Sequence, residues 1–456
     1  MLAKHRLVAG LVVALVALPA HAQETTPPIE IQTFTLDNGL TVIVHEDHST
    51  PVVAVNIWYD VGSANEETGR SGFAHLFEHM LFQETENLEP GEFKRHVLSA
   101  GGTYNGTTNE DRTAYFETLP SNRLNLALWL EADRMARLKV TAENFQRERE
   151  VVKEERRLRI DNQPYGNAML TLDTLVADWP PYNHTVIGSM DDLNAATSDD
   201  VLAFYKKYYV PNNATLIVAG DVKVDDVRKM AGKYFGGIPR GSEPAELPPF
   251  TPTPRGDGER RITVEDALAN TPLYLAGFNI PPHKADDSYA LQLLSGIFSQ
   301  GESSRLHQRL VKAEQAALVV FSTLDSRVGP GLFWFAALPN QGVEIEQIES
   351  LINEEIDKLK NEGVSDRELQ KAKNQLRTGQ IMSRQTVFSK TQEIQHYRLY
   401  HGDAATINAD IDKYMSVTID DIRRVARMYL VPVNRSVVIA APAGEAKPEK
   451  KKAATS

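Results

Sequence analysis

The sequence predicts a mixed α/β (α+β) fold built from two homologous domains. Short apolar runs typical of strands alternate with long helical segments along the chain. A helix–turn–strand pattern occurs twice, at residues 197–220 and again at 418–441. Between the copies, residues 239–257 are rich in proline and glycine and lack apolar periodicity, which is typical of a linker. These observations place the two domains at 23–238 and 258–443.

The two copies of the repeated pattern agree in detail. TSDDVLAFYKKYYVPNNATLIVAG and TIDDIRRVARMYLVPVNRSVVIAA share eight residues at the same spacing, 221 positions apart. Each copy predicts a capped helix, a turn at Val-Pro and an apolar strand. A chance match of a common unit is the alternative, but a separation of about half the mature chain favours duplication.

Further elements follow from the apolar patterns between these landmarks. The expected strands are 52–61, 114–120 and 332–339, and the expected helices are 123–138, 142–160 and 365–382.

The two ends of the chain are expected to lie outside the fold. Residues 1–22 have a basic start, an apolar stretch of 14 residues and an Ala-His-Ala cleavage signal, which is typical of a secretory signal peptide. The apolar stretch is short for a membrane span, which needs about 20 residues, although an uncleaved anchor is the alternative. Residues 444–456 have the composition of a disordered tail.

Composition limits the classes of function. The formal net charge of −12 argues against nucleic acid as a partner. The chain has no cysteine, which excludes disulfides, a lipid-anchored N-terminal cysteine and thiolate metal sites. Any metal must therefore be held by histidine, aspartate or glutamate. Together with the signal peptide, this predicts a soluble periplasmic protein of a Gram-negative bacterium, without a stable membrane anchor.

One apolar segment, FAHLFEHMLF at residues 73–82, contains three polar side chains. Burying them costs several kcal/mol unless each finds a partner. On a helix, His75 and His79 lie one turn apart on the same face and can chelate one metal ion. Glu78 lies beside that face, where a carboxylate can take a proton from water at the metal. The pattern is His-x-x-Glu-His, the inverted zinc-protease signature, and ordinary hydrogen-bonded core histidines are the alternative.

A zinc site of this kind needs a third protein ligand and an open position for water. In the predicted helix that includes FQREREVVKEERRL, Glu148 and Glu155 are seven residues apart and share one face. Glu154 is interpreted as part of a solvated charged face. For Glu155 considered alone, an ordinary surface glutamate is the alternative.

The motif and its surroundings resemble the insulin-degrading enzyme, pitrilysin and mitochondrial processing peptidase family of zinc metallopeptidases. In that family, H-x-x-E-H is followed by a glutamate some 76 positions after the second histidine, which here is Glu155, with a further glutamate at the position of Glu148. The resemblance implies that His75, His79 and Glu155 bind one Zn²⁺ per chain. It also implies Glu78 as catalytic base, Glu148 as a supporting catalytic acid, and a mostly antiparallel sheet packed with helices in each domain.

The segment GGTYNGTTNEDRTAYFETLP also resembles the family, where it includes an edge strand beside the active site. An extended peptide can pair with such an edge through its backbone. The resemblance therefore implies Asn105 and Thr107 as substrate-binding residues. The family's usual Asn-Ala is Asn105-Gly106 here, and on composition alone the segment is a turn-rich hairpin.

The second half carries no second zinc motif. Its stretch 290–300, at the expected position, contains neither histidine nor glutamate, and the following GESSRLHQRLVKAEQAALVV resembles a family segment that supplies a substrate-binding arginine and tyrosine. Arg305 matches the arginine, but the tyrosine position holds Leu318. A surface arginine and a core leucine are the alternative. We therefore expect the zinc half of a heterodimer, whose related two-domain subunit supplies the Arg/Tyr pair, with a homodimer as runner-up.

The function implied by the resemblance is that of a zinc-dependent endopeptidase. Its substrates are expected to be oligopeptides or unfolded segments, enclosed in a chamber between domains or subunits. A non-catalytic metal-binding or structural subunit is the alternative. Subunits of that class in the family have lost the zinc motif, whereas this chain keeps all five motif positions.

Overall fold

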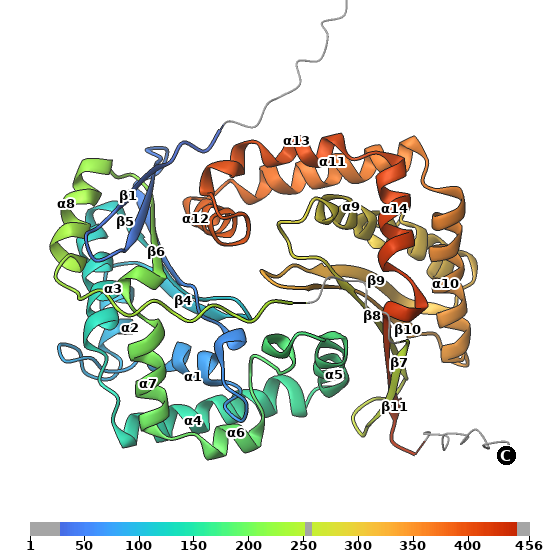
Figure 1. Ribbon diagram of the computed structural model, residues 1–456, viewed down its shortest axis with the longest axis horizontal. Helices are drawn as coiled ribbons and strands as arrows, with labels where there is room; N and C mark the ends of the chain where they lie inside the picture. Colours follow the sequence, from blue (N-terminus) through green and yellow to red (C-terminus); the bar gives the residue numbers. More distant parts are fainter. Residues whose placement is uncertain (1–27, 251–257, 445–456) are drawn as a thin grey trace, which may run out of the picture.

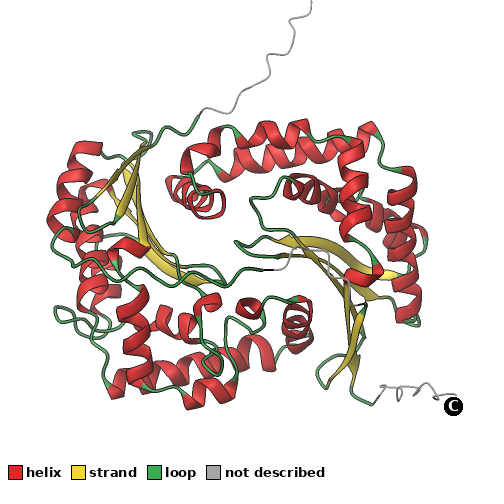
Figure 2. Ribbon diagram, viewed as in Figure 1, coloured by secondary structure: helices red, strands yellow, loops and turns green. Residues whose placement is uncertain are grey.

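Two curved sheets, each flanked by helices, dominate the structure, a computed structural model that describes residues 28–250 and 258–444 (Figures 1 and 2). The first sheet has the strand order β1-β2-β6-β3-β5-β4, and the second has the order β7-β11-β8-β10-β9. Only the pairs β2/β6 and β7/β11 are parallel among the described strands. The prediction of a mixed fold with mostly antiparallel sheets is therefore confirmed.

The strands of the first sheet are β1 (Gln32–Thr35), β2 (Thr41–Glu46), β3 (Val52–Tyr59), β4 (Thr103–Thr108), β5 (Thr113–Pro120) and β6 (Ala214–Gly220). Those of the second are β7 (Arg260–Asp266), β8 (Leu273–Ile280), β9 (Ala317–Asp325), β10 (Gly331–Pro339) and β11 (Arg435–Pro442). The α-helices of the first half are α1 (Phe73–Met80), α2 (Glu92–Ser99), α3 (Leu124–Arg137), α4 (Ala142–Arg156), α5 (Gly166–Val176), α6 (Met190–Ala195), α7 (Ser198–Tyr208) and α8 (Val224–Phe235). Those of the second half are α9 (Asp287–Ser299), α10 (Ile345–Glu362), α11 (Asp366–Ser383), α12 (Val387–His396), α13 (Asp410–Ser416) and α14 (Ile419–Tyr429). Three short π-helical segments are η3 (Arg157–Asp161), η6 (His307–Ala313) and η7 (Tyr397–His401).

The sequence repeat corresponds to a repeat in three dimensions. Its two copies form α7 with β6 and α14 with β11, each strand lying between a parallel and an antiparallel neighbour. Thr197 and Thr418 cap the two helices by accepting a hydrogen bond from the backbone N–H three residues later. The side chains of Asn213 and Asn434 each donate to the carbonyl group of the last helical residue before them, at 2.9 and 2.8 Å. The shared residues are thus the ones that fix the helix start and the turn.

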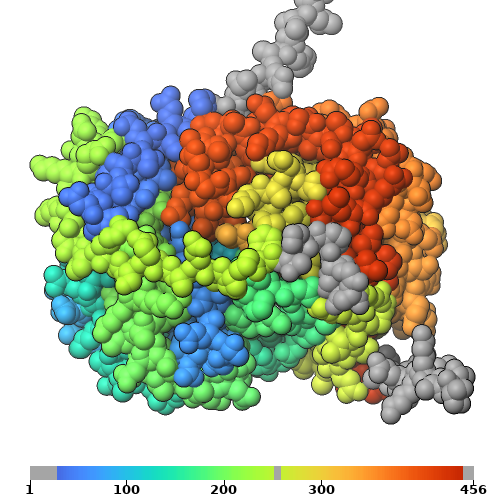
Figure 3. Space-filling model, in the orientation of Figure 1, coloured from blue at the N-terminus to red at the C-terminus, as the bar shows by residue number. Residues whose placement is uncertain are grey.

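Each half supplies a helix to the sheet of the other half. Leu172 on α5 belongs to a cluster with Leu275 and Leu332 of the second sheet. In return, α12 lies on the first sheet, where Asn56 on β3 donates to the hydroxyl of Thr391 at 3.1 Å. Figure 3 shows the orange-red segment that follows α11 in contact with the blue N-terminal strands. The helices α5 and α12 therefore build smaller apolar clusters between the halves, whereas the large core of each half is formed by its own residues.

A buried arginine joins the two halves as well. Arg327, in the turn after β9, is 4% exposed and pairs with Glu110 at 3.1 Å, with Asp173 and with Asp325. Burial opposes its charge, but the three carboxylates raise the pKa of Arg327 well above its usual range. Because Glu110 and Asp173 belong to the first half, this ion-pair network crosses between the halves.

Replacing this arginine is expected to destabilise the whole chain. Arg327→Met leaves three carboxylates without their cation and should lower the free energy of unfolding by roughly 3–5 kcal/mol. Arg423→Met is the matched control, because Asp420, an exposed residue on the same helix, is the one ion-pair partner of Arg423 within the described part of the chain, and its loss should cost less than about 1 kcal/mol. Urea-induced unfolding measures both variants, and equal losses would contradict the assignment.

Several predicted segments fall outside the described residues. These are the signal peptide at 1–22, residues 251–257 of the linker and all but the first residue of the tail at 444–456. Residues 239–250 are described and contain neither helix nor strand. The domain limits 23–238 and 258–443 stay predictions. Over 28–250 and 258–444, no helix combines the length and the apolar character that crossing a membrane requires.

Candidate active site and metal centre

The motif helix α1 begins at a glycine that no other residue can easily replace. Gly72 has a φ of +89°, and a Cβ there would lie 2.8 Å from the carbonyl oxygen of Ile187. The buried carboxylate of Glu66 accepts hydrogen bonds from the backbone N–H groups of Gly72 and Ala74, at 2.9 and 2.7 Å. A carboxylate at this end also complements the helix dipole. The start of α1, and with it the direction of the motif side chains, is fixed in this way.

The three predicted zinc ligands, His75 and His79 on α1 and Glu155 on α4, meet between these two helices. The Oε2 atom of Glu155 lies 3.1 Å from Nε2 of His79 and 3.7 Å from Nε2 of His75. The two imidazole rings are 5.0 Å apart, and one ligand atom from each of the three residues lies within 4.8 Å of the others. Two imidazoles and a carboxylate form a donor set that suits zinc and leaves a fourth position open. The geometry therefore fits the predicted metal.

The electrostatics of this group fit a cation too. Burial and the neighbouring His79 lower the pKa of His75 to about 4, so its ring is neutral at neutral pH. Nδ1 of His75 is buried and has no hydrogen-bond partner among the described residues. The hydrogen bond from His79, which outweighs the opposing effect of burial, lowers the pKa of Glu155. Neutral imidazole and ionised carboxylate are the forms that bind metal.

Glu78 is held beside this group by the edge strand β4. Its Oε2 atom accepts a hydrogen bond of 2.6 Å from the hydroxyl of Thr108. Burial raises the pKa of Glu78, and the hydrogen bond from Thr108 acts in the opposite direction. A Cβ at Gly106 would lie 3.0 Å from the Cγ atom of Glu78 and equally close to Phe82, so the glycine lets β4 approach the carboxylate.

A second carboxylate on α4 stands at the other nitrogen of His79. Glu148 is 6% exposed, and its Oε2 atom is 3.9 Å from Nδ1 of His79, while Arg147 donates to its other oxygen at 3.2 Å. Such carboxylates orient metal-binding imidazoles. Glu154, one residue before Glu155, is exposed and instead pairs with Arg157, three residues later in the chain.

The predicted substrate-binding residues of β4 alternate with the residues that contact Glu78. Because side chains of a strand point alternately to its two faces, Gly106 and Thr108 share the face toward Glu78, whereas Asn105 and Thr107 point the other way. Asn105 is exposed, and the hydroxyl of Thr107 accepts a hydrogen bond of 2.6 Å from Arg112. Thr108 was not singled out from the sequence, although this alternation could have identified it.

Comparison with known proteins identifies the family of the chain. The family description "Insulinase (Peptidase family M16)" matches residues 41–173, and "Peptidase M16 inactive domain" matches residues 195–376. The zinc protease PqqE of Helicobacter pylori is 33% identical over 433 residues, which cover 94% of this chain and 97% of that protein. The chain belongs to the insulinase family, peptidase family M16.

Solved structures and a further sequence relative support the assignment to the insulinase family. A crystal structure of a protease from Helicobacter pylori, 32% identical, has a TM-score of 0.85 and covers 91% of this chain and 100% of that one. An uncharacterised zinc protease of Mycobacterium leprae is 27% identical, with 87% and 88% of the two chains covered. The crystal structure of a peptidase M16 inactive domain from Pseudomonas fluorescens, 19% identical, shares the fold at a TM-score of 0.80, with 92% and 100% covered.

Two positions of the second half were compared with the insulinase family, Arg305 as a match and Leu318 in place of the family's tyrosine, and the hydrogen bonds of Arg305 go to residues of the second half. Arg305 donates to Glu368 at 2.6 Å and to the carbonyl oxygen of Gly363 at 2.9 Å. Leu318 lies on the edge strand β9 and is 60% exposed, so its interpretation as a core residue is wrong. The substrate-binding role of Arg305 stays a prediction, and the structure adds a role in packing α11.

The pair of Arg305 and Glu368 is expected to stabilise the second half in a pH-dependent way. Burial alone would raise the pKa of Glu368, but hydrogen bonds from Arg305 and Ser365 lower it to about 2. A lowered carboxyl pKa contributes stability that is complete above the unfolded value of about 4.5 and is lost as the pH falls toward 2. Arg305→Ala and Glu368→Gln should each cost about 1–3 kcal/mol at pH 7. In acid, the difference in unfolding free energy between wild type and Glu368→Gln should shrink.

The same pair of variants separates the two roles of Arg305. If the arginine only packs α11, both variants lower the melting temperature, and KM for peptides stays as it is in the wild type. If it also binds substrate, Arg305→Ala raises KM and Glu368→Gln does not.

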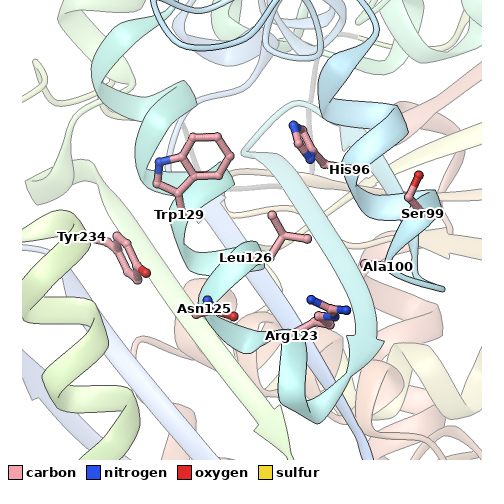
Figure 4. A pocket seen from close by; sticks show the side chains of 8 residues that line it. All are labelled: His96, Ser99, Ala100, Arg123, Asn125, Leu126, Trp129 and Tyr234. Carbon is pink, nitrogen blue, oxygen red and sulfur yellow. The ribbon is translucent and has the colours of Figure 1, made fainter.

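The surface has a hollow that lies apart from the motif residues. It has a volume of about 430 Å³ and is formed by residues of α2, α3 and α8 and their flanking turns (Figure 4). The residues that line it are His96, Ser99, Ala100, Arg123, Asn125, Leu126, Trp129 and Tyr234. None of the predicted site residues is among them, so this hollow is not the metal centre.

Proposed function

We propose that this chain is a zinc-dependent endopeptidase with one Zn²⁺ held by His75, His79 and Glu155. The observation that carries the proposal is the approach of these three side chains, with ligand atoms within 4.8 Å of one another, next to the partly buried carboxylate of Glu78. Membership of the insulinase family and the zinc protease relatives support it. The motif is complete in this chain, which favours catalysis over a structural subunit.

In this mechanism the protein groups handle the protons. When bound, zinc supplies a water molecule whose pKa is lowered toward about 7 and polarises the scissile carbonyl group. Glu78 accepts the proton of the attacking water and passes it to the leaving amine. Thr108 keeps the carboxylate oriented through its 2.6 Å hydrogen bond. Glu148 orients the imidazole of His79 and is therefore a positioning residue that does not contact the substrate.

The edge strand β4 is proposed as the place where the substrate backbone pairs. It has β5 on one side and is the last strand of the described sheet, so no described strand pairs with its other side, where a substrate strand could add. Backbone pairing does not depend on side-chain identity, and it requires an extended segment. Oligopeptides and unfolded segments, not folded proteins, are therefore the proposed substrates.

A library of quenched fluorescent peptides, assayed with and without a metal chelator, tests the proposal. Cleavage should stop when the chelator removes the metal and should return when zinc is restored. Internal cleavage sites, identified by mass spectrometry, distinguish an endopeptidase from an exopeptidase. A chain that carries zinc and cleaves none of the peptides, alone or with a partner subunit, would exclude the proposed activity.

A partner subunit is part of the proposal. The exposed apolar residues Leu318, Val319 and Phe321 lie along β9, at the edge of the second sheet, and such an edge needs a cover in a stable assembly. A related two-domain subunit that supplies the arginine and the tyrosine is the proposed partner, and a second copy of this chain is the runner-up. Full activity of the isolated chain, unchanged by a co-expressed relative, would exclude the heterodimer.

The proposed location is the periplasm, reached through the signal peptide at 1–22. Mass spectrometry of the protein from a periplasmic extract tests this, because cleavage after Ala22 leaves Gln23 as the first residue. A mature protein that retains residues 1–22 would instead support the anchored alternative.

A further inference from the structure

Three histidines of the second half meet outside the zinc motif. His283 lies in the loop after β8, His396 is the last residue of α12, and His401 is the last residue of η7. The Nε2 atom of His283 is 3.0 Å from Nε2 of His401 and 3.1 Å from Nε2 of His396. The rings are partly buried, and one nitrogen from each lies within 4.8 Å of the other two. The three predicted zinc ligands His75, His79 and Glu155 meet the same limit.

The π-helical turn η7 is what brings two of these histidines together. On a regular α-helix, residues five apart point about 140° away from each other. A π-helical turn is closed by hydrogen bonds between residues five apart, so His396 and His401 come to lie on one side. Such turns occur frequently at functional sites.

The third histidine is positioned independently of α12. Two prolines, Pro281 and Pro282, precede His283 and restrict its loop. The backbone N–H of His283 donates to the carbonyl oxygen of the buried Arg327 at 3.0 Å. Two separately anchored segments therefore direct imidazole nitrogens at the same point.

Two of the three nitrogen–nitrogen distances are close to those of a metal site. In a tetrahedral zinc site with Zn–N bonds of 2.0–2.1 Å, the nitrogens are about 3.3 Å apart. The contacts of 3.0 and 3.1 Å need to open by only a few tenths of an ångström to admit an ion. A chain of hydrogen-bonded histidines without metal is the alternative arrangement, and it uses the same three residues.

The surroundings keep the rings in the metal-binding form. Burial and neighbouring histidines lower the pKa of His283 to about 4 and that of His396 to about 3, so both are neutral at neutral pH. The charge of Asp410 acts on His283 and His401 and favours a cation. Arg112 and Lys413 act on the group in the opposite sense.

We propose that His283, His396 and His401 bind a divalent transition-metal ion, zinc in the first place, at a second site separate from the motif. Imidazole ligands suit zinc, copper and nickel, and three of them leave one position for water. The ion joins the β8 loop to η7 and, through α12, to the first sheet. Its role is to fasten the two halves of the chain together.

Metal counting on the full mature chain tests the proposal. We expect about two zinc ions per chain in the wild type and about one in His79→Ala, which removes the motif site. His401→Ala should also hold about one, and the double variant should hold none. His48→Ala is the matched control, because His48 is an exposed histidine beside two carboxylates and its loss should leave the count at about two.

Measurements on the single variant His79→Ala keep the test decisive even if His401→Ala fails to fold. Zinc X-ray absorption of this variant should show three imidazole ligands, and added zinc should raise its melting temperature by several degrees. Binding of copper or nickel at the same three ligands supports the site and corrects the ion. A His79→Ala chain that holds no metal and whose melting temperature does not respond to these ions would overturn the proposal in favour of the hydrogen-bonded cluster.

Discussion

Glu78→Gln is expected to keep the zinc and to lower kcat/KM for peptides by a factor of about 10²–10⁴. The amide has nearly the shape of the carboxylate and can still accept the hydrogen bond from Thr108, so α1 and the ligands should stay in place. What the amide cannot do is accept a proton at neutral pH. Metal analysis and the peptide assay, made on the same preparation, separate the loss of the base from the loss of the metal.

The control for this substitution is a glutamate of the neighbouring helix. Glu150→Gln removes an exposed carboxylate that pairs with Lys153 at 3.0 Å, and it should leave kcat/KM within about a factor of two. A Glu78→Gln chain with full activity would exclude Glu78 as the base. A chain that lost both metal and activity would instead give this residue a structural part in the metal site.

The second large effect is expected in zinc affinity. Glu155→Gln replaces the charged carboxylate of the proposed ligand, whose Oε2 atom lies 3.1 Å from Nε2 of His79, by a neutral amide. The affinity should fall by more than about 100-fold, because even residues that only orient ligands are worth 10–100-fold. Glu154→Gln is the matched control, since it changes the adjacent residue, which points about 100° away on the helix. Its affinity should stay within about twofold, as expected for an exposed residue that pairs with Arg157. Competition with a chromophoric chelator measures both, and the reverse order of effects would contradict the register of α4.

The parts of the site that could be predicted involve residues that are close together in the sequence or separated by a fixed spacing known from the family. His75 and His79 are one helical turn apart, so their common face follows from the sequence alone. The capped helices of the repeat follow in the same way from Thr197 and Thr418. In each case the residues that interact are within a few positions of each other, or the family spacing supplies the missing distance, as it did for Glu155.

What could not be predicted depends on how distant segments meet. His283 and His396 are 113 positions apart, and a π-helical turn has no apolar period that would place His401 beside them. The same holds for Arg327, whose partner Asp173 is 154 positions away. No local pattern signals such contacts, because they form only when segments that are distant in the sequence pack together in the folded chain.

The exchange of α5 and α12 has a consequence for how the chain can be divided. In the first half, Ile43 and Ile217 are covered by Ile394 and Ile407, which that half does not contain. Without the second half, this face of the first sheet would be bare. Residues 28–250 and 258–444, produced as separate polypeptides, should consequently reassemble with each other, because each still carries the helix that the other's sheet lacks.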